Sequence, residues 1–383
     1  MSLSARQSVS LLFLVNGFLL GTWAGKIPAF ADRLSLSESS VGLMIVVFGV
    51  GSILTMPVIG VVIARFGTAI VTKFLSIAAA TTILWITLSP NVALAGVALF
   101  AFGAFIAGMD VAMNAFAVEV EKKISKPIMS SCHGFWSLGG LGGAVISGYF
   151  LEFFDPYSHA IVTTLLSGLV VAAALPQLKS SGSSAPLKKT KLAFPRVLLP
   201  YLVGFVALCA AMPEGAVLDW SALYLKQELG ASALTATFAF GAFSGTMAIV
   251  RFFGDPIRAH YGAVRTMRAC AIIAFAGLLI AGTANSATIA IAGFLIAGLG
   301  MSNLVPIAFS AAGNLPGLAP GIGLSMATTI GYSGLLVAPA SFGYLAEIFS
   351  FSSVFTGLAA ALLLVVFLAQ IVRHADGNSV DSG

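Results

Sequence analysis

The chain has 383 residues, of which 58% are hydrophobic and only 9% are charged, with a formal net charge of +5. A soluble domain carries about 25% charged residues, so a soluble chain of this length could not cover its surface with charge. The Lys and Arg residues lie between apolar stretches, which argues against a phosphate-binding face for nucleic acid. Lipid tolerates such apolar exposure, so the composition indicates a polytopic membrane protein.

Apolar stretches of about 20 residues or more, each long enough to cross a bilayer as a helix, recur twelve times along the chain. They predict an all-α membrane protein with helices over residues 8–31, 38–64, 69–88, 92–119, 128–152, 158–178, 197–224, 232–254, 264–284, 287–312, 318–346 and 351–373. The three cysteines, Cys132, Cys209 and Cys270, fall within these stretches. Their odd number and the lack of a CxxC motif predict neither a disulfide framework nor a metal site.

Residues 179–196 are rich in Ser, Gly and Lys and divide the twelve stretches into six and six. We therefore expect an N-terminal six-helix bundle over 1–178, a basic linker over 179–196 and a C-terminal six-helix bundle over 197–383. With the N-terminus in the cytoplasm, all Lys and Arg residues except Lys26, Arg33 and Lys226 fall at cytosolic helix ends. The positive-inside rule thus predicts that both termini are cytoplasmic.

The two halves resemble repeats of each other. Gly148-Tyr149-x-x-Glu152-x-Phe154 recurs as Gly343-Tyr344-x-x-Glu347-x-Phe349 after a shift of 195 residues. The same shift maps Gly67 onto Gly262 and Gly139 onto Gly334. Because three matches share one register, they favour two pseudo-symmetric bundles.

Twelve spans, two halves and a basic central loop resemble the major facilitator superfamily. The loop signature of that family is found as Gly60-Val-Val-Ile-Ala64-Arg65-Phe-Gly67, with Ala64 at the acidic position. A fuller copy reads Arg251-Phe-Phe-Gly254-Asp255-Pro-Ile-Arg258-Ala-His-Tyr-Gly262. The resemblance implies that Arg65, Asp255 and Arg258 take part in a cytosolic gate. The alternative is charges that merely extend from the helix ends to the interface.

Within the superfamily, the chain resembles the fucose-permease-like branch over nearly its full length. The motifs that carry this resemblance are Gly108-Met-Asp110-Val-Ala-Met-Asn114, Met301-Ser-x-x-x-Pro306-x-x-Phe309-Ser310 and Thr329-Ile-Gly331-x-x-Gly334-x-x-x-x-Pro339-x-x-x-Gly343. The branch implies proton-coupled uptake of a sugar-like solute. The chain departs from it four residues before Pro28, where Ala24 replaces the proton-linked carboxylate and Lys26 is the nearby ionisable residue.

Ionisable side chains deep in a span are costly, so they should face a partner or a wet cavity. Asp110 lies mid-span with Asn114 one turn later on the same face, which predicts a proton-coupling and substrate-binding pair. The alternative is a permanent ion pair between Asp110 and Lys26. Lys26 follows Trp23 by three residues, so the two could hold a solute together; the alternative for Lys26 is a lysine at the outer gate.

The seventh span contains Pro213-Glu214-Gly215 and, further on, Asp219. Pro and Gly interrupt a helix and can open backbone groups to a cavity. We expect Glu214 to be a site or coupling carboxylate. Asp219 lies nearer the outer end, where a gating role is at least as well supported as substrate contact.

Four further side chains complete the predicted cavity. Trp136 could stack on a sugar ring or only pack, and His133 could relay protons or be an interfacial histidine. Asn16 and Asn303 are amides in apolar spans that need partners, so each could bind substrate hydroxyls or join helices.

These features predict a secondary active transporter that moves a small polar solute, such as a sugar or sugar acid, by alternating access as a proton symporter. The alternative is a proton-driven exporter of drugs or metabolites. The resemblance disfavours it, because exporters of the superfamily carry Pro where this chain has Ala144. We find no catalytic motif in the sequence, so we do not expect an enzyme. We also find no output domain and no repeated filter motif, so we expect neither a sensor nor a channel. We expect a monomer in the bacterial inner membrane without a cofactor, whose partners are its small-molecule substrate, protons and the lipid bilayer.

Overall fold

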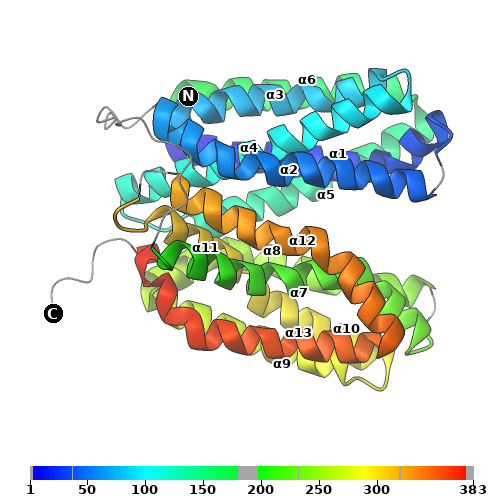
Figure 1. Cartoon of the computed structure of the whole chain (residues 1–383), viewed down its shortest axis with the longest axis vertical. Coiled ribbons are helices and arrows are strands. Elements are labelled where there is room, and N and C mark those ends of the chain that lie inside the picture. Colours follow the sequence, from blue (N-terminus) through cyan, green and yellow to red (C-terminus); the bar gives the residue numbers. More distant parts are fainter. Residues whose placement is uncertain (1–2, 37, 180–196, 232, 319–320, 377–383) are drawn as a thin grey trace. The chain divides into compact units, whose positions relative to one another are not determined.

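The computed structural model describes residues 3–36, 38–179, 197–231, 233–318 and 321–376, and every regular element among them is helical (Figure 1). The first half of the chain forms α1 (Ala5–Arg33), α2 (Glu38–Phe66), α3 (Thr68–Leu88), α4 (Val92–Ile124), α5 (Met129–Phe153), α6 (Pro156–Ala174) and the short 3-10 helix η1 (Leu175–Gln177). The expected linker, residues 179–196, lies outside the described residues apart from Lys179.

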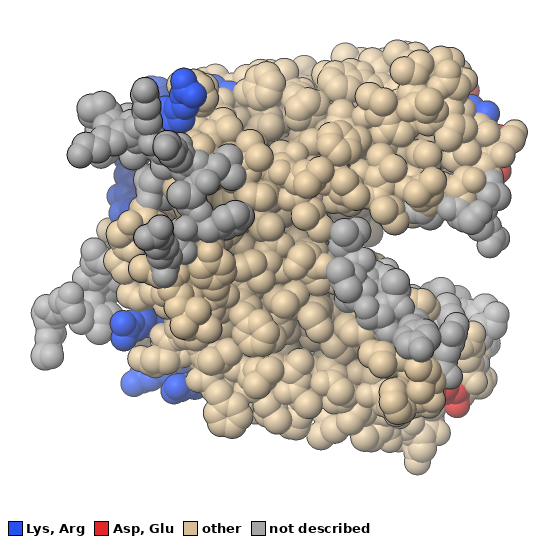
Figure 2. Space-filling view, viewed as in Figure 1, with Lys and Arg blue, Asp and Glu red and all other residues tan. Residues whose placement is uncertain are grey.

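The second half forms α7 (Leu199–Gln227), α8 (Ala233–Tyr261), α9 (Ala263–Gly282), α10 (Ala287–Met301), α11 (Leu304–Gly313), α12 (Ile322–Ile348), α13 (Phe351–Leu368) and the 3-10 helix η2 (Ala369–Asp376). Eight segments of the described chain are helices long and apolar enough to cross a membrane. Large apolar side chains on the outside fit this: Leu43, Phe74, Leu169 and Phe367 are each 59% exposed or more. Figure 2 shows a mostly uncharged face, with Lys and Arg towards helix ends.

Two expected helices differ most from the structure. The eighth helix was expected to end at residue 254, but α8 continues through Pro256 to Tyr261, so most of the predicted loop motif is helical. The tenth span was expected to be one helix over 287–312, but it divides into α10 and α11 at Ser302 and Asn303. Both corrections move polar residues into or beside helices, where they need partners inside the protein.

Local sequence explains where several helices begin. Gly67 precedes α3 with φ 82° and Gly262 precedes α9 with φ 79°, a backbone conformation that favours glycine. The side chain of Asn91 accepts a hydrogen bond from the backbone N–H of Leu94 and caps α4. Asp155 caps α6 in the same way, and the hydrogen bonds that it accepts from Ser158 and Tyr157 lower the pKa of its carboxyl.

Contacts group the residues into two compact units. The first comprises Met1–Ile128, Cys132–Phe194 and Gly317–Ser325, and the second comprises Met129–Ser131, Pro195–Pro316 and Met326–Gly383. In the first unit α4 packs on α2 and α3, and α6 packs on α1 and α3. In the second, α10 packs on α8 and α9, and α13 packs on α7 and α9, so the same packing order occurs in both units.

Glycines allow close helix contacts at two positions that the 195-residue shift relates. A Cβ added to Gly139 of α5 would lie 2.0 Å from the carbonyl oxygen of Leu14 in α1. A Cβ added to Gly334 of α12 would lie 2.4 Å from Cδ1 of Leu208 in α7. Close approach of this kind is how helices associate in lipid, where apolar burial alone gives little driving force.

We predict that Gly139→Ala destabilises the protein by about 1–3 kcal/mol or more, because the backbone atoms it meets cannot move without separating α1 from α5. Gly142→Ala on the same helix is the matched control, since its added Cβ would meet nothing within 4 Å. Thermal unfolding of the detergent-solubilised proteins, followed by size-exclusion chromatography, measures the difference. Equal midpoints for the two variants would contradict the predicted role of this contact.

Candidate functional site

A cluster of polar side chains joins α1, α4 and α5 inside the first unit. Asn16 of α1 is 1% exposed and donates from Nδ2 to the carbonyl oxygen of Ile106 in α4, at 3.1 Å. Its Oδ1 accepts a hydrogen bond from Nε1 of Trp136 in α5, at 3.0 Å. Both ends of this amide are therefore satisfied by two different helices.

Asp110 lies one turn after Ile106 and continues the cluster. Nδ2 of Asn114 donates to Oδ1 of Asp110 at 3.2 Å and to its backbone carbonyl at 2.9 Å. Oδ1 of Asn114 is 3.3 Å from Nε2 of His133, one turn before Trp136 on α5, and the ring of Phe13 packs edge-on against His133. The predicted residues Asn16, Asp110, Asn114 and Trp136 therefore lie on neighbouring turns of α1, α4 and α5, and His133 contacts Asn114 beside them.

Lys26 lies apart from this cluster. Its Nζ is 3.0 Å from the carbonyl oxygen of Pro156 and 3.3 Å from Nδ1 of His159, both on α6, and the residue is 2% exposed. No ion pair between Lys26 and Asp110 is found among the described residues. On α1 it is Asn16 that contacts α4 one turn before Asp110, and Lys26 lies ten residues, about 15 Å of helix rise, further along α1. The ring of Trp23 does not contact the same residues as Lys26, and packs against the rings of Phe30 and Phe102.

The second unit contains an ion pair that the sequence had not indicated. Nη2 of Arg251 in α8 lies 3.4 Å from Oε1 of Glu214 in α7. The Arg251 side chain is 3% exposed and that of Glu214 is 27% exposed. Arg251 was expected at a cytosolic helix end; it instead lies ten residues before the end of α8, about three turns inside it, which corrects that expectation.

The break between α10 and α11 lies next to this pair. Nε of Arg251 is 3.4 Å from the carbonyl oxygen of Ser302, a position where the helical hydrogen-bonding pattern is interrupted. Asn303 is 1% exposed, and its Oδ1 accepts a 2.6 Å hydrogen bond from Oγ of Ser130. Discontinuous helices of this kind expose backbone groups to polar partners inside membrane proteins.

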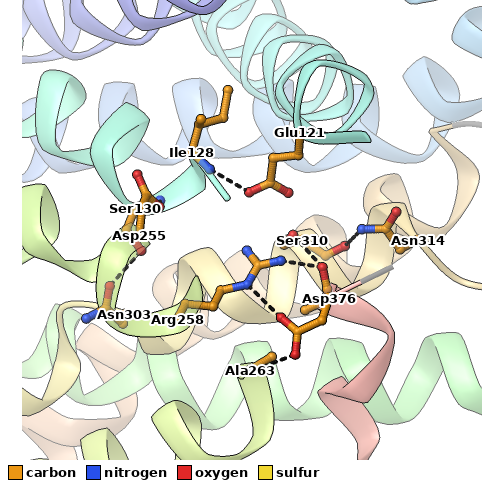
Figure 3. Close-up of polar contacts among 11 residues, drawn as sticks. Glu121, Ile128, Ser130, Asp255, Arg258, Ala263, Asn303, Ser310, Asn314 and Asp376 are labelled. Carbon is orange, nitrogen blue, oxygen red and sulfur yellow. Dashed lines mark hydrogen bonds and ion pairs between the residues drawn. The ribbon is translucent and has the colours of Figure 1, made fainter. Parts of the chain in front are cut away.

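The predicted gating residues of α8 bind helix ends (Figure 3). The carboxylate of Asp255 accepts hydrogen bonds from the backbone N–H groups of Ser130 and Ser131 in the first turn of α5, each at 2.8 Å. Nε of Arg258 lies 3.2 Å from Oδ1 of Asp376 at the end of η2. Oδ2 of Asp376 also accepts from the backbone N–H of Ala263, so it caps α9.

The structure describes fewer contacts for the two remaining residues predicted to act in gating, Arg65 and Asp219. Arg65 is exposed at the end of α2, with its guanidinium carbon 5.2 Å from the ring centre of Phe66. The backbone of Asp219 belongs to α7, and its side chain lies outside the described residues. Neither placement tests a gating role, which stays a prediction.

The two clusters offer different chemistry. The first supplies amide, indole and carboxyl groups, which suit hydrogen bonds to hydroxyls and the exchange of a proton. The second supplies a guanidinium, which suits an anion. Sequence reasoning found Glu214 and Asn303 but missed Arg251 as the partner of Glu214, although its place in an apolar stretch was a signal.

We predict that Trp136→Phe destabilises the protein by about 1–3 kcal/mol, because it leaves the buried Oδ1 of Asn16 without its donor. The matched control is Trp85→Phe on α3, where the ring is 43% exposed. Thermal unfolding in detergent measures both variants. A midpoint for Trp136→Phe at or above that of Trp85→Phe would show that the indole hydrogen bond is dispensable.

Comparison with known proteins places these clusters in context. The sequence profile of the Major Facilitator Superfamily matches residues 9–316. An uncharacterized MFS-type transporter of Yersinia pestis is 33% identical over 373 residues, which cover 97% of each chain. The structure of FucP, the fucose:proton symporter of E. coli, is similar with a TM-score of 0.77 and 18% sequence identity, over 96% of this chain and 98% of FucP. The structure of the proton:xylose symporter XylE is similar with a TM-score of 0.72 and 13% sequence identity, over 95% of this chain and 94% of XylE.

Proposed function

Because the chain belongs to the major facilitator superfamily and is a transporter rather than an enzyme, we propose that it moves a small polar solute, a sugar or sugar acid, by alternating access as a proton symporter. The observation that carries this proposal is the group of polar side chains formed by buried Asn16, Asp110 and Asn114 and half-buried Trp136 within apolar helices. Such groups are costly in a membrane helix unless they serve a partner or a ligand.

This group of side chains supports a polyhydroxylated solute. The indole of Trp136 beside the amide of Asn16 offers a flat apolar face together with donors and acceptors, the combination that suits a sugar ring. The fold likeness to FucP and XylE, which carry fucose and xylose, is in keeping with this class.

Asp110 is the proposed coupling group of the first unit. It is 6% exposed and shares its carboxyl with a neutral amide, so a proton can be added there without breaking an ion pair to Lys26. Alternating access would let this carboxyl gain a proton on one side of the membrane and lose it on the other. Binding of solute and proton would then each favour the same state.

We predict that Asp110→Asn abolishes accumulation driven by a pH gradient, because the amide cannot exchange a proton. Proteoliposomes with an acidic exterior and radiolabelled L-fucose, D-xylose, D-galactose or D-galacturonate measure uptake, and reversing the gradient distinguishes import from export. Asp32→Asn, at an exposed aspartate near the end of α1, is the matched control. Undiminished accumulation by Asp110→Asn would remove this residue from the coupling step, and indifference of every solute to the gradient would overturn symport.

The membrane-embedded chain is proposed to lie in the bacterial inner membrane with both termini in the cytoplasm, as the positive-inside rule predicts. A reporter fused after Asp376 tests this orientation in bacterial cells. We expect a fusion to green fluorescent protein to fluoresce and a fusion to alkaline phosphatase to be inactive, since the phosphatase folds only outside the cytoplasm. The reverse pair of results would invert the proposed topology.

A further inference from the structure

We propose that Lys26 of α1 and His159 of α6 form a proton-binding site that acts as a pH switch. The pair holds one proton while the two side chains are in contact, and uptake of a second proton breaks this contact between α1 and α6. The site is separate from the polar side chains around Asp110, because ten residues of α1, about 15 Å, lie between Lys26 and Asn16. The inference goes beyond the proposed symport, since no solute takes part in it.

The pair belongs to a chain of hydrogen bonds that joins three helices, near the end where α1 and α5 finish and α6 begins. Nζ of Lys26 is 3.3 Å from Nδ1 of His159, and Nε2 of His159 is 3.0 Å from Oγ of Ser147 on α5. Oγ of Ser147 donates to the carbonyl oxygen of Thr22 on α1 at 3.2 Å. All four residues are 2% exposed or less, so the chain is shielded from solvent.

The direction of these hydrogen bonds fixes where the imidazole of His159 carries its proton. A carbonyl oxygen can only accept, so the single proton of the Ser147 hydroxyl is used on Thr22. Ser147 must then accept from Nε2 of His159, which leaves Nδ1 as an acceptor that faces Lys26. In this arrangement His159 is neutral, with its proton on Nε2.

The contact accommodates one positive charge and not two. The ammonium of Lys26 donates to Nδ1 of His159 and to the carbonyl oxygen of Pro156, which is 3.0 Å away. A further proton would bind Nδ1 and turn this acceptor into a donor that faces another donor, with two cations in contact inside the protein. Like charges in contact disfavour each other, so the second proton is taken up only when Lys26 and His159 separate.

α1 is suited to bend at this point. Pro28 lies in α1 two residues after Lys26, and proline lacks the backbone N–H that continues the hydrogen-bonding pattern of a helix. The first turn of α6 is held more firmly, because Asp155 accepts hydrogen bonds from two backbone N–H groups of that turn. The contact can therefore open without movement of the whole of α1. On the proposed topology this end faces the outside, so the switch would respond to external acid.

The other titratable groups on the helices around the pair are exposed, bound elsewhere or distant. Asp32, Asp155 and Tyr157 are exposed, and Arg33 donates to carbonyl oxygens at the end of α3. The side chains of Tyr149 and Glu152 on α5 lie outside the described residues. The remaining groups on helices that pack on the pair lie 15 or more residues, about 22 Å or more, from this end of their own helices: Arg6, Lys73, Asp110, Glu119, Glu121, Lys122, Lys123, Cys132 and His133.

The first measurement reads the protons on His159 directly. The chain has four histidines, so NMR of the isotope-labelled full-length protein in detergent can resolve their ring nitrogens, and His159→Gln identifies the signals of His159. At pH 7.5 we expect a proton on Nε2 alone. A proton on Nδ1 at this pH would overturn the directed chain and the switch that depends on it, and this result needs no variant beyond the one used for assignment.

The second measurement follows the contact between α1 and α6. Spin labels on Asp32→Cys and Tyr157→Cys, both exposed positions, report the distance between the two helix ends. The protein with only its native cysteines, all buried, is the labelling control. The ratio of the long-distance to the short-distance population should rise by up to about 100-fold from pH 7.5 to pH 5.5, the limit for one linked proton over two pH units.

Matched variants assign this proton to the pair. Lys26→Met removes the opposing ammonium and His159→Gln removes the acceptor of the second proton, so each should abolish the pH dependence of the distance. His260→Gln, at an exposed histidine of α8, should keep it. Glu152→Gln should also keep it, because the switch does not use the carboxyl of Glu152.

The outcomes are separate from those that test symport. Distances that ignore pH in the wild type, or a pH dependence that survives in His159→Gln or in Lys26→Met, would overturn the switch. Loss of the pH dependence in Glu152→Gln would also overturn it and would assign the proton to that carboxyl. Failure of the switch would leave the proposed symport standing, because Asp110 takes no part in it. A confirmed switch would likewise stand if uptake proved indifferent to the pH gradient.

Discussion

A guanidinium three turns inside an apolar helix cannot be left without a counter-charge, and this constraint organises the interior of the second unit. Arg251 meets it with a carboxylate from α7 and a backbone carbonyl from the break between α10 and α11. The break between α10 and α11 leaves the carbonyl oxygen of Ser302 available to Arg251. In an uninterrupted helix that carbonyl would accept a hydrogen bond from its own helix. The charge on α8 and the irregular backbone beside it thus compensate each other.

The first unit meets the demand for polar partners with amides, an indole and an imidazole. Asn16 binds Ile106 and Trp136, Asn114 binds Asp110 and His133, and each link joins a different pair of helices or successive turns of α4. Networks of this kind hold helices in register because a displaced helix would leave several buried groups unsatisfied at once. Two units with the same packing order therefore hold different polar groups in their interiors.

Close packing sets these interiors in place. Gly139 lets the backbone of α5 pack against α1. This contact brings Asn16 of α1 within hydrogen-bonding distance of Trp136, which lies one turn before Gly139 on α5. Capping contacts fix the helix ends: Asp255 binds the first turn of α5, and Asp376 binds the first turn of α9 and Arg258. The residues that resemble a loop signature are thereby engaged in holding helix termini, a task for which carboxylates at helix N-termini are well suited.

The sequence by itself determined the all-helical membrane class, the family and most helix positions, because apolar length and the spacing of charges are local properties that lipid enforces directly. It also singled out Asp110, Asn114, Asn16 and Trp136 as candidates, since side chains that can form hydrogen bonds are conspicuous in apolar spans. Only the tertiary structure decided their partners: it joined Trp136 to Asn16, turned Lys26 to His159 rather than to Asp110, and placed Arg251 beside Glu214. Partners come from helices far apart in the chain, and their choice depends on helix rotation and on the break at Ser302 and Asn303, which no local pattern encodes.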